Sequence, residues 1–283
     1  MTKTAVQQIM IGGVCKTEAK AATALGAIKA AGYDGIELND FMITPSPLIV
    51  RMLTRAAGMP VGSAGKLDWK HLVREAGLEV TSLHTNLGCL MERPEGTIAL
   101  ARELDTSTVV ITGMYRFDYS DRDAVETLAC DLDACGERLA AEGIKLLYHN
   151  HNSEFRKVAP GVTAYELLLE QTDPAKVNFE LDTYWPAEAG VDVLGLMRRV
   201  GSRLRLWHIN DRGARVKGPS MTPILASDSM ELGCGNMPLE ELWALAQASN
   251  VEGIVLETHK NWIDKSPVKS LEVSAAWLRD HVR

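Results

Sequence analysis

Short stretches typical of β-strands alternate with longer stretches typical of α-helices along the whole chain, and this alternation limits the fold more than any other feature. The first stretch is VQQIMIGG at 6–13, and the Ala-rich TEAKAATALGAIKAAG at 17–32 follows it with residues that favour helix. A second begins with YDGIELN at 33–39. Six further pairs follow: 77–86 with 93–104, 107–113 with 121–142, 144–151 with 163–172, 176–182 with 191–200, 203–211 with 238–249, and 251–259 with 271–280. The chain therefore contains eight strand–helix pairs in 283 residues.

This order predicts a closed barrel. Strands that alternate with helices pair in parallel through right-handed crossovers, and eight such units form a (β/α)8 TIM barrel. Gly32, Gly77 and Gly143 each lie between a helical stretch and a strand, where a left-handed residue is favoured. An open doubly wound sheet is the main alternative, but no GxGxxG follows the first strand. We expect one α/β domain over residues 1–283.

Charge and composition exclude several classes of partner. The net charge of −7 disfavours nucleic acid, which needs a basic face. No run of 18 apolar residues is present, which argues against a membrane span, and MTKTAVQQIMIGG lacks the pattern of a signal peptide. The five cysteines are scattered without CxxC spacing, which is typical of free thiols in a reducing compartment. We therefore expect a cytoplasmic protein.

Polar side chains gather where the predicted strands end. In such a barrel the chemistry lies at the carboxyl ends of the strands, so these positions are the candidates for a site. Five of the seven histidines lie there, with several carboxylates: the set is Glu37, His84, His149, His151, Asp182, His208, Asp211, Glu257 and His259. We expect Glu37 and His84, on earlier strands, to line the wall opposite the others.

Four consecutive strands, the fifth to the eighth, end in His149, Asp182, His208 and Glu257. Neighbouring strands lie about 5 Å apart, so these side chains can converge on one ion. Imidazole and carboxylate donors suit Mn²⁺, Co²⁺, Fe²⁺ or Zn²⁺ at a catalytic site, and the absence of a thiolate disfavours structural zinc. Taken singly, Asp182 could instead cap the following turn, and Glu257 could pair with Lys260.

Three residues near this predicted metal site have open roles. His151 faces the same way as His149, because strand side chains alternate, and could be a second ligand or a base. Glu154 follows the strand and could act at the site, or lie in solvent or pair with Arg156. Trp185, next to Tyr184, could pack in the core or stack on a sugar ring.

A long segment at 211–236, rich in Gly, Pro and Ser, is the widest predicted loop. Loops of this length in compact domains are often functional lids.

Several motifs resemble those of the sugar phosphate isomerase/epimerase family, the xylose-isomerase-like barrels that include inosose dehydratases, inosose isomerases and ketose 3-epimerases. The motifs are GYDGIELN, YHNHNSEF, ELDTYWPAEAGVDVL, RLWHIND, ELGCGNMPLEEL and GIVLETH. The resemblance covers almost the whole chain. The pair YHNHxxEF and DTYWxxxAGxD looks like a subgroup that acts on keto-sugars and their glycosides.

The resemblance implies one divalent metal ion held by Glu, Asp, His and Glu from strands five to eight. Asp182, His208 and Glu257 match three of these positions, and His149 stands where the family has Glu. In the ketose epimerases that Glu is also an acid/base group, so His151, Glu154 or Glu257 would have to supply the base here. Mn²⁺ is the first choice of ion, with Co²⁺, Mg²⁺, Fe²⁺ and Zn²⁺ as alternatives.

The chemistry that fits is abstraction of a proton α to a carbonyl, with a metal stabilising the enediolate and a base of near-neutral pKa. Isomerisation or epimerisation of a keto-sugar is the first hypothesis. β-Elimination by a lyase or dehydratase, on a keto-sugar, an inosose or a 3-keto-glycoside, is the second, because it does not need two matched bases. Phosphodiester cleavage, as in endonuclease IV relatives, and an inactive sugar-binding barrel are less favoured.

Substrate contacts are expected from Glu37, His84, Trp185 and Lys260. A homo-oligomer or a small partner subunit are the alternatives for protein partners.

Overall fold

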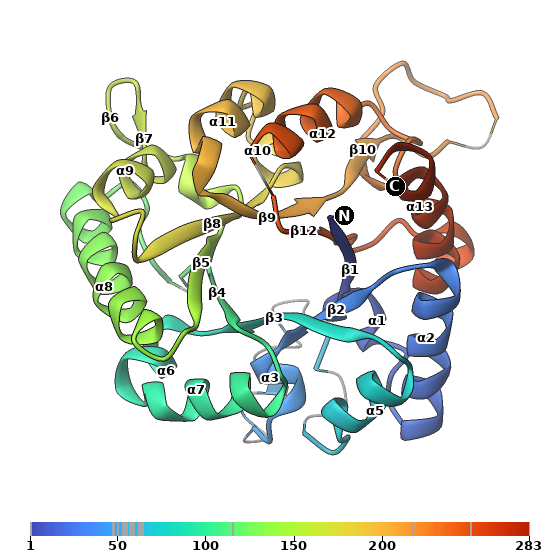
Figure 1. Cartoon of the computed structure of the whole chain (residues 1–283). Helices are drawn as coiled ribbons and strands as arrows, with labels where there is room; N and C mark the ends of the chain where they lie inside the picture. The colour runs from blue at the N-terminus through green and yellow to red at the C-terminus, as the bar shows by residue number, and fades with distance from the viewer. Residues whose placement is uncertain are drawn as a thin grey trace. The chain divides into compact units, whose positions relative to one another are not determined.

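The computed structural model describes residues 2–46, 49, 51, 52, 56, 60, 61, 65–114, 116–216, 218–249 and 251–282. Eight strands form a closed barrel in the order β1-β12-β9-β8-β5-β4-β3-β2, so the predicted (β/α)8 fold is confirmed (Figure 1). The barrel strands are β1 (Lys3–Gln7), β2 (Gly35–Asn39), β3 (Glu79–Thr85), β4 (Thr108–Thr112), β5 (Lys145–His149), β8 (Val177–Asp182), β9 (Leu204–Ile209) and β12 (Gly253–Leu256).

Helices follow these strands, as the alternation predicts. The first strand, however, is Lys3–Gln7, and most of the stretch expected as strand at 6–13 is helix. They are α1 (Gln8–Gly12), α2 (Glu18–Ala31), α3 (Asp40–Ile43), α5 (Trp69–Glu75), α6 (Leu87–Glu92), α7 (Pro94–Glu103), α8 (Arg122–Ala140), α9 (Ala164–Gln171), α10 (Tyr184–Glu188), α11 (Val193–Val200), α12 (Leu239–Ala248) and α13 (Pro267–His281). In the described part of the chain, 3₁₀ turns cover Ser153–Phe155, Gly201–Arg203 and Ile263–Lys265. Gly32, Gly77 and Gly143 have φ of 105°, 68° and 74°, which confirms the left-handed backbone expected at these positions. Among the described residues, no helix has the length and apolar character that crossing a membrane requires.

One compact unit comprises residues 1–79, 208–244 and 253–283. Within it, β1 pairs in parallel with both β2 and β12, and this register puts Glu37 beside Gln7. Helices α2 and α13 contact each other along the outside of these strands (Figure 1). Tyr33 ties α13 to β2 by donating a hydrogen bond of 2.9 Å from its hydroxyl to the carbonyl of Leu271. These contacts hold α2 and α13 close to β1, β2 and β12, the strands that lead to Glu37 and Glu257.

A second compact unit comprises residues 80–207 and 245–252. Its strands β3, β4, β5 and β8 are paired in parallel, and the register sets His149 directly beside Glu180. Helix α8 packs on β5 and against α9 (Figure 1). Val110 of β4, Leu147 of β5 and Leu206 of β9 form one buried apolar cluster. A rigid, apolar strand layer therefore positions the polar strand ends.

The segment predicted as one wide loop at 211–236 is partly regular. It contains β10 (Asp211–Gly213) and β11 (Asp228–Met230), which pair antiparallel, and residue 217 lies outside the described residues. The carboxylate of Asp211 accepts hydrogen bonds from the backbone N–H groups of Gly233, Gly235 and Met237 at 2.8–3.0 Å. The strand β9 thus continues into an anchored hairpin. A second short hairpin is formed by β6 (Lys157–Ala159) and β7 (Val162–Thr163).

Candidate functional site

His208, at the end of β9, is held between two carboxylates. Its Nε2 lies 2.7 Å from Oε1 of Glu37, and its Nδ1 lies 3.0 Å from Oε2 of Glu257. The three side chains are buried. A neutral imidazole has one N–H donor, so only one of these two contacts can be an ordinary hydrogen bond unless the ring is protonated. Glu37, expected on an opposite wall, instead contacts a predicted metal ligand directly.

Glu257 follows β12, and the next residues along the chain include His259 and Lys260. His259 is about a quarter exposed, and its Nε2 lies 3.7 Å from Oε2 of Glu257. The Nζ of Lys260 lies 3.2 Å from Oδ2 of Asp228 on β11. Among the described residues, then, the alternative of a Glu257–Lys260 pair is not observed. The assignment of Lys260 to substrate binding stays a prediction.

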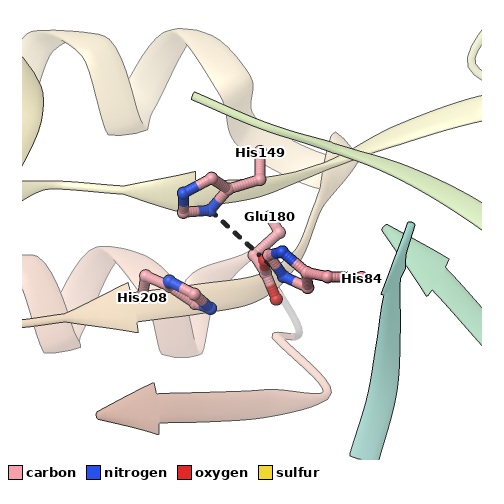
Figure 2. Close-up of side chains that lie close together, drawn as sticks. All are labelled: His84, His149, Glu180 and His208. Carbon is pink, nitrogen blue, oxygen red and sulfur yellow. Dashed lines mark hydrogen bonds and ion pairs between the residues drawn. The ribbon is translucent and has the colours of Figure 1, made fainter. Parts of the chain in front are cut away.

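Glu180, inside β8, faces two imidazoles. Its Oε2 lies 2.8 Å from Nε2 of His84 and 3.3 Å from Nδ1 of His149 (Figure 2). The two rings meet edge to face, with centroids 5.3 Å apart. Sequence reasoning missed Glu180, although a usable signal was present: it is a carboxylate within an apolar strand, two residues before Asp182 and therefore on the same face.

Asp182 ends β8 and has a second, structural contact. Its Oδ1 accepts a hydrogen bond of 3.0 Å from the backbone N–H of Trp185, so the turn-capping alternative is observed. The amide of Asn150 bridges to the backbone of Asp182 with two bonds of 3.1 Å. These contacts fix the conformation of Asp182, which is compatible with a role as a ligand through a carboxylate oxygen.

His151 lies beside His149, as the alternation of side chains predicts. Their ring centroids are 5.1 Å apart, and the ring of Trp185 lies 5.7 Å from that of His151. Trp185 in turn meets Tyr184 edge to face. His151 and Trp185 are both half-buried, so these two rings form a partly accessible face next to His149.

Glu154 is completely buried rather than exposed. It accepts hydrogen bonds from the hydroxyl of Tyr148 at 3.1 Å, the hydroxyl of Ser153 at 2.9 Å and the backbone N–H of His151 at 3.1 Å. Burial raises the pKa of this carboxyl above its ordinary value, although the hydrogen bonds oppose the shift. The alternatives of solvent exposure and of an ion pair with Arg156 are wrong, because Arg156 pairs with Asp118.

The polar network around Glu154 extends to a second phenol and depends on a glycine. The hydroxyls of Tyr119 and Tyr148 lie 2.8 Å apart. A Cβ at Gly113 would lie 2.5 Å from Oε1 of Glu154 and 3.2 Å from Nδ1 of His151. Only glycine therefore leaves room at 113 for the carboxylate and the imidazole.

The structure contains a buried cluster that could hold a divalent ion. Among the described residues, two overlapping sets of four buried side chains offer ligand atoms within 4.8 Å of one another. One set is His149, Asp182, His208 and Glu257, and the other is His84, His149, Glu180 and His208, which Figure 2 shows. The first set is the one predicted from the strand ends. Its mixed nitrogen and oxygen donors are those that divalent transition metals use at catalytic sites.

The model of the xylose isomerase-like TIM barrel family matches residues 25–281. The chain belongs to this family. Inosose dehydratases of Mesomycoplasma hyopneumoniae are 26% identical over 196 residues, and the match spans 66% of this chain but only 61% of their length. A sugar phosphate isomerase/epimerase from Parabacteroides distasonis has a similar structure, with a TM-score of 0.75, 23% identity and coverage of 98% of this chain and 93% of that one. The IolI protein, solved with a bound zinc atom, has a TM-score of 0.69 at 11% identity over 99% and 98% of the two chains.

Proposed function

We propose that this protein is a divalent-metal-dependent enzyme that removes a proton α to the carbonyl of a keto-sugar or sugar derivative, as an isomerase or epimerase. The observation that carries the proposal is the convergence of the ligand atoms of His149, Asp182, His208 and Glu257 within 4.8 Å. Membership of the xylose isomerase-like family supports a sugar as the substrate.

The proposed ligands of the ion are these four side chains. The buried group around His208 has two carboxyl groups for one imidazole, so with both carboxyl groups ionised it would have an excess of negative charge that a cation would offset. The donor set therefore fits a divalent ion, with Mn²⁺ as first choice and Zn²⁺, the ion bound by the similar IolI protein, as the next. When bound, such an ion supplies Lewis-acid stabilisation of negative charge on the carbonyl oxygen.

His151 is the proposed base. Its ring lies beside His149 and is half-buried, so that a substrate can reach it, and an imidazole has a suitable ordinary pKa near neutrality. Glu154 has no exposed surface and binds the backbone N–H of His151, which makes it a positioning residue rather than a base. Trp185 offers its ring face to the substrate, next to His151.

β-Elimination is the second candidate reaction. The strand end that holds Glu in the ketose epimerases holds His149 here, so a matched pair of carboxylate acid/base groups is not formed in the same way. The sequence similarity to inosose dehydratases points in the same direction. An elimination needs one base and a leaving group, and His151 alone meets the first requirement.

The test is an incubation of ketoses, inososes and 3-keto-glycosides in D₂O with the purified protein and added Mn²⁺. We expect deuterium at the α-carbon of a substrate, removal of this exchange by chelation, and a loss of about 100-fold or more in His151→Gln, as is usual for a general base. Loss of water or aglycone would select the lyase reaction. The matched control is His71→Gln, because His71 is exposed on α5.

The outcome that contradicts the proposal is equally specific. Exchange that is unaffected by chelation and by Asp182→Asn would exclude the metal site. The absence of exchange with every substrate of the panel, in protein that binds Mn²⁺, would exclude the proposed chemistry.

A further inference from the structure

Three asparagines lie buried at the ends of barrel strands, and one of them differs from the others. Asn39 ends β2 and exchanges two hydrogen bonds with Gln7, at 2.9 and 3.3 Å. Asn150 follows β5 and uses both amide atoms on the backbone of Asp182. Asn210 follows β9 and is 1% exposed, yet neither its Oδ1 nor its Nδ2 has a hydrogen-bond partner among the described residues.

This arrangement is unfavourable for the free protein. A buried amide without partners loses its hydrogen bonds to water and gains none in return, so it lowers the stability of the fold. Asn39 and Asn150 avoid this loss through protein partners. At Asn210 no described residue compensates the donor or the acceptor in this way.

The backbone directs Asn210 toward the His208 side of its strand. Successive side chains alternate, and the residues on either side of Asn210 point the other way. Ile209 is buried in the apolar core, and Asp211 directs its carboxylate to the N–H groups of Gly233 and Gly235. Asn210 therefore shares a face with His208, whose ring contacts Glu37 and Glu257.

We propose that Asn210 is a substrate-binding and specificity residue that recognises two adjacent oxygens of a polyhydroxy compound, a vicinal diol or an α-hydroxy ketone. A primary amide offers one acceptor and an N–H donor side by side. Oδ1 accepts a hydrogen bond from one hydroxyl, and Nδ2 donates to the neighbouring oxygen. This inference rests on the proposed function, because the ligand is the sugar of that same site.

The test combines stability and binding, and it needs no turnover. In Asn210→Leu, which replaces the amide by an apolar group of similar size, we expect the free protein to melt at the same or a higher temperature than the wild type. The concentration of polyol that gives the half-maximal rise in melting temperature should increase by roughly tenfold or more, as expected for the loss of one or two hydrogen bonds. The probes are myo-inositol, D-fructose and D-glucose, with and without Mn²⁺. Asn39→Leu is the matched control, and it should lower the melting temperature because its amide is bonded.

Two results would overturn the inference: a fall in melting temperature in Asn210→Leu with unchanged polyol dependence, or the absence of any polyol-dependent rise in the wild type. Its failure is distinguishable from that of the proposed function. Deuterium exchange in the wild type, together with unchanged polyol binding in Asn210→Leu, removes the role of Asn210 alone. Polyol binding that depends on Asn210, without exchange from any substrate, removes the proposed reaction alone.

Discussion

The two buried groups of histidine and carboxylate have opposite compositions. In one, a single imidazole, His208, contacts the carboxylates of Glu37 and Glu257. In the other, a single carboxylate, Glu180, contacts the imidazoles of His84 and His149. Both groups are buried, so the balance of charge within each decides what it can bind.

The charge balance indicates that the group around His208 needs a cation and that the group around Glu180 does not. If His208 is protonated, two carboxylates around it still leave one negative charge in excess. Around Glu180, protonation of one of the two imidazoles is enough for neutrality. We therefore expect a divalent ion to be held by the set that includes Glu257 and His208, with Glu180 orienting His149 from behind. The Oε2 of Glu180 lies 3.3 Å from Nδ1 of His149, and a carboxylate next to a ligating imidazole is common at metal sites.

The largest expected effect comes from removal of the single imidazole. In His208→Ala, Glu37 and Glu257 lose the partner that they share, and uncompensated buried charges cost about 3–5 kcal/mol. We expect a loss of this size in the free energy of unfolding in urea at neutral pH, measured without metal, and loss of bound metal by elemental analysis. His71→Ala should change neither, because His71 is exposed. Full metal content in His208→Ala would exclude His208 as a ligand.

A second comparison distinguishes the two sets of ligands. Glu180→Gln removes a charge-assisted hydrogen bond to His84 and should lower the free energy of unfolding by about 1.5–3 kcal/mol, while the metal still binds, with an affinity lowered by about 10–100-fold. Asp182→Asn should lose most of the metal. Both substitutions preserve the size of the side chain, and elemental analysis with a metal titration measures the result. The reverse outcome, metal lost in Glu180→Gln and kept in Asp182→Asn, would assign the ion to His84, His149, Glu180 and His208.

The barrel and the polar residues at its strand ends were accessible from sequence because both depend on regular spacing. Alternation of strands and helices predicts a parallel barrel, and in such a barrel the site lies at the carboxyl ends of the strands. His149 and Asp182 are the last residues of β5 and β8, and His208 is the last but one of β9. Glu180 was missed because it lies two residues before the end of β8, whereas the prediction considered only the ends of the strands. Its contact with His149 depends on the register between β5 and β8, which the sequence does not show.

The remaining differences come from tertiary contacts that no local pattern contains. Lys260 contacts Asp228, which lies on β11, and β11 pairs with β10 within a segment that the sequence predicts as loop. Glu154 is buried because the hydroxyl of Tyr148 and the open space at Gly113 accommodate its carboxylate. From the sequence alone, a single Glu that follows a strand is as compatible with an exposed position as with a buried one.

Glu154 differs from Glu37, Glu180 and Glu257, because its hydrogen-bond partners are hydroxyls and a backbone N–H rather than imidazoles. Its position depends on Gly113, where a Cβ would lie 2.5 Å from Oε1 of Glu154. In Gly113→Ala we therefore expect a loss of about 1–3 kcal/mol in the free energy of unfolding, the usual cost of overpacking. Gly96→Ala in α7 is the matched control: a Cβ there meets nothing within 4 Å, and alanine favours helix, so stability should be unchanged or higher. A neutral Gly113→Ala would show that the carboxylate can move aside at little cost.

The smallest expected effect is a dependence on pH. Burial raises the pKa of Glu154, so the folded protein retains a proton that the unfolded chain releases near its ordinary pKa of about 4.3. As pH rises from this value through the folded pKa, the unfolded state binds fewer protons than the folded state, and stability falls. Glu154→Gln lacks this proton. The free energy of unfolding of the wild type minus that of the variant should therefore decrease over this range and then level off.

Urea unfolding at a series of pH values measures this difference, and Asp118→Asn provides a control of opposite sign. Hydrogen bonds from Ser120 lower the pKa of Asp118, so its contribution is present above the ordinary pKa and is lost as pH falls. If the Glu154 difference instead increased with pH, the carboxylate would be ionised and stabilised in the folded protein. Glu154 would then have a cationic partner, such as His151. The distinction between Glu154 and the carboxylates that contact histidines would be wrong.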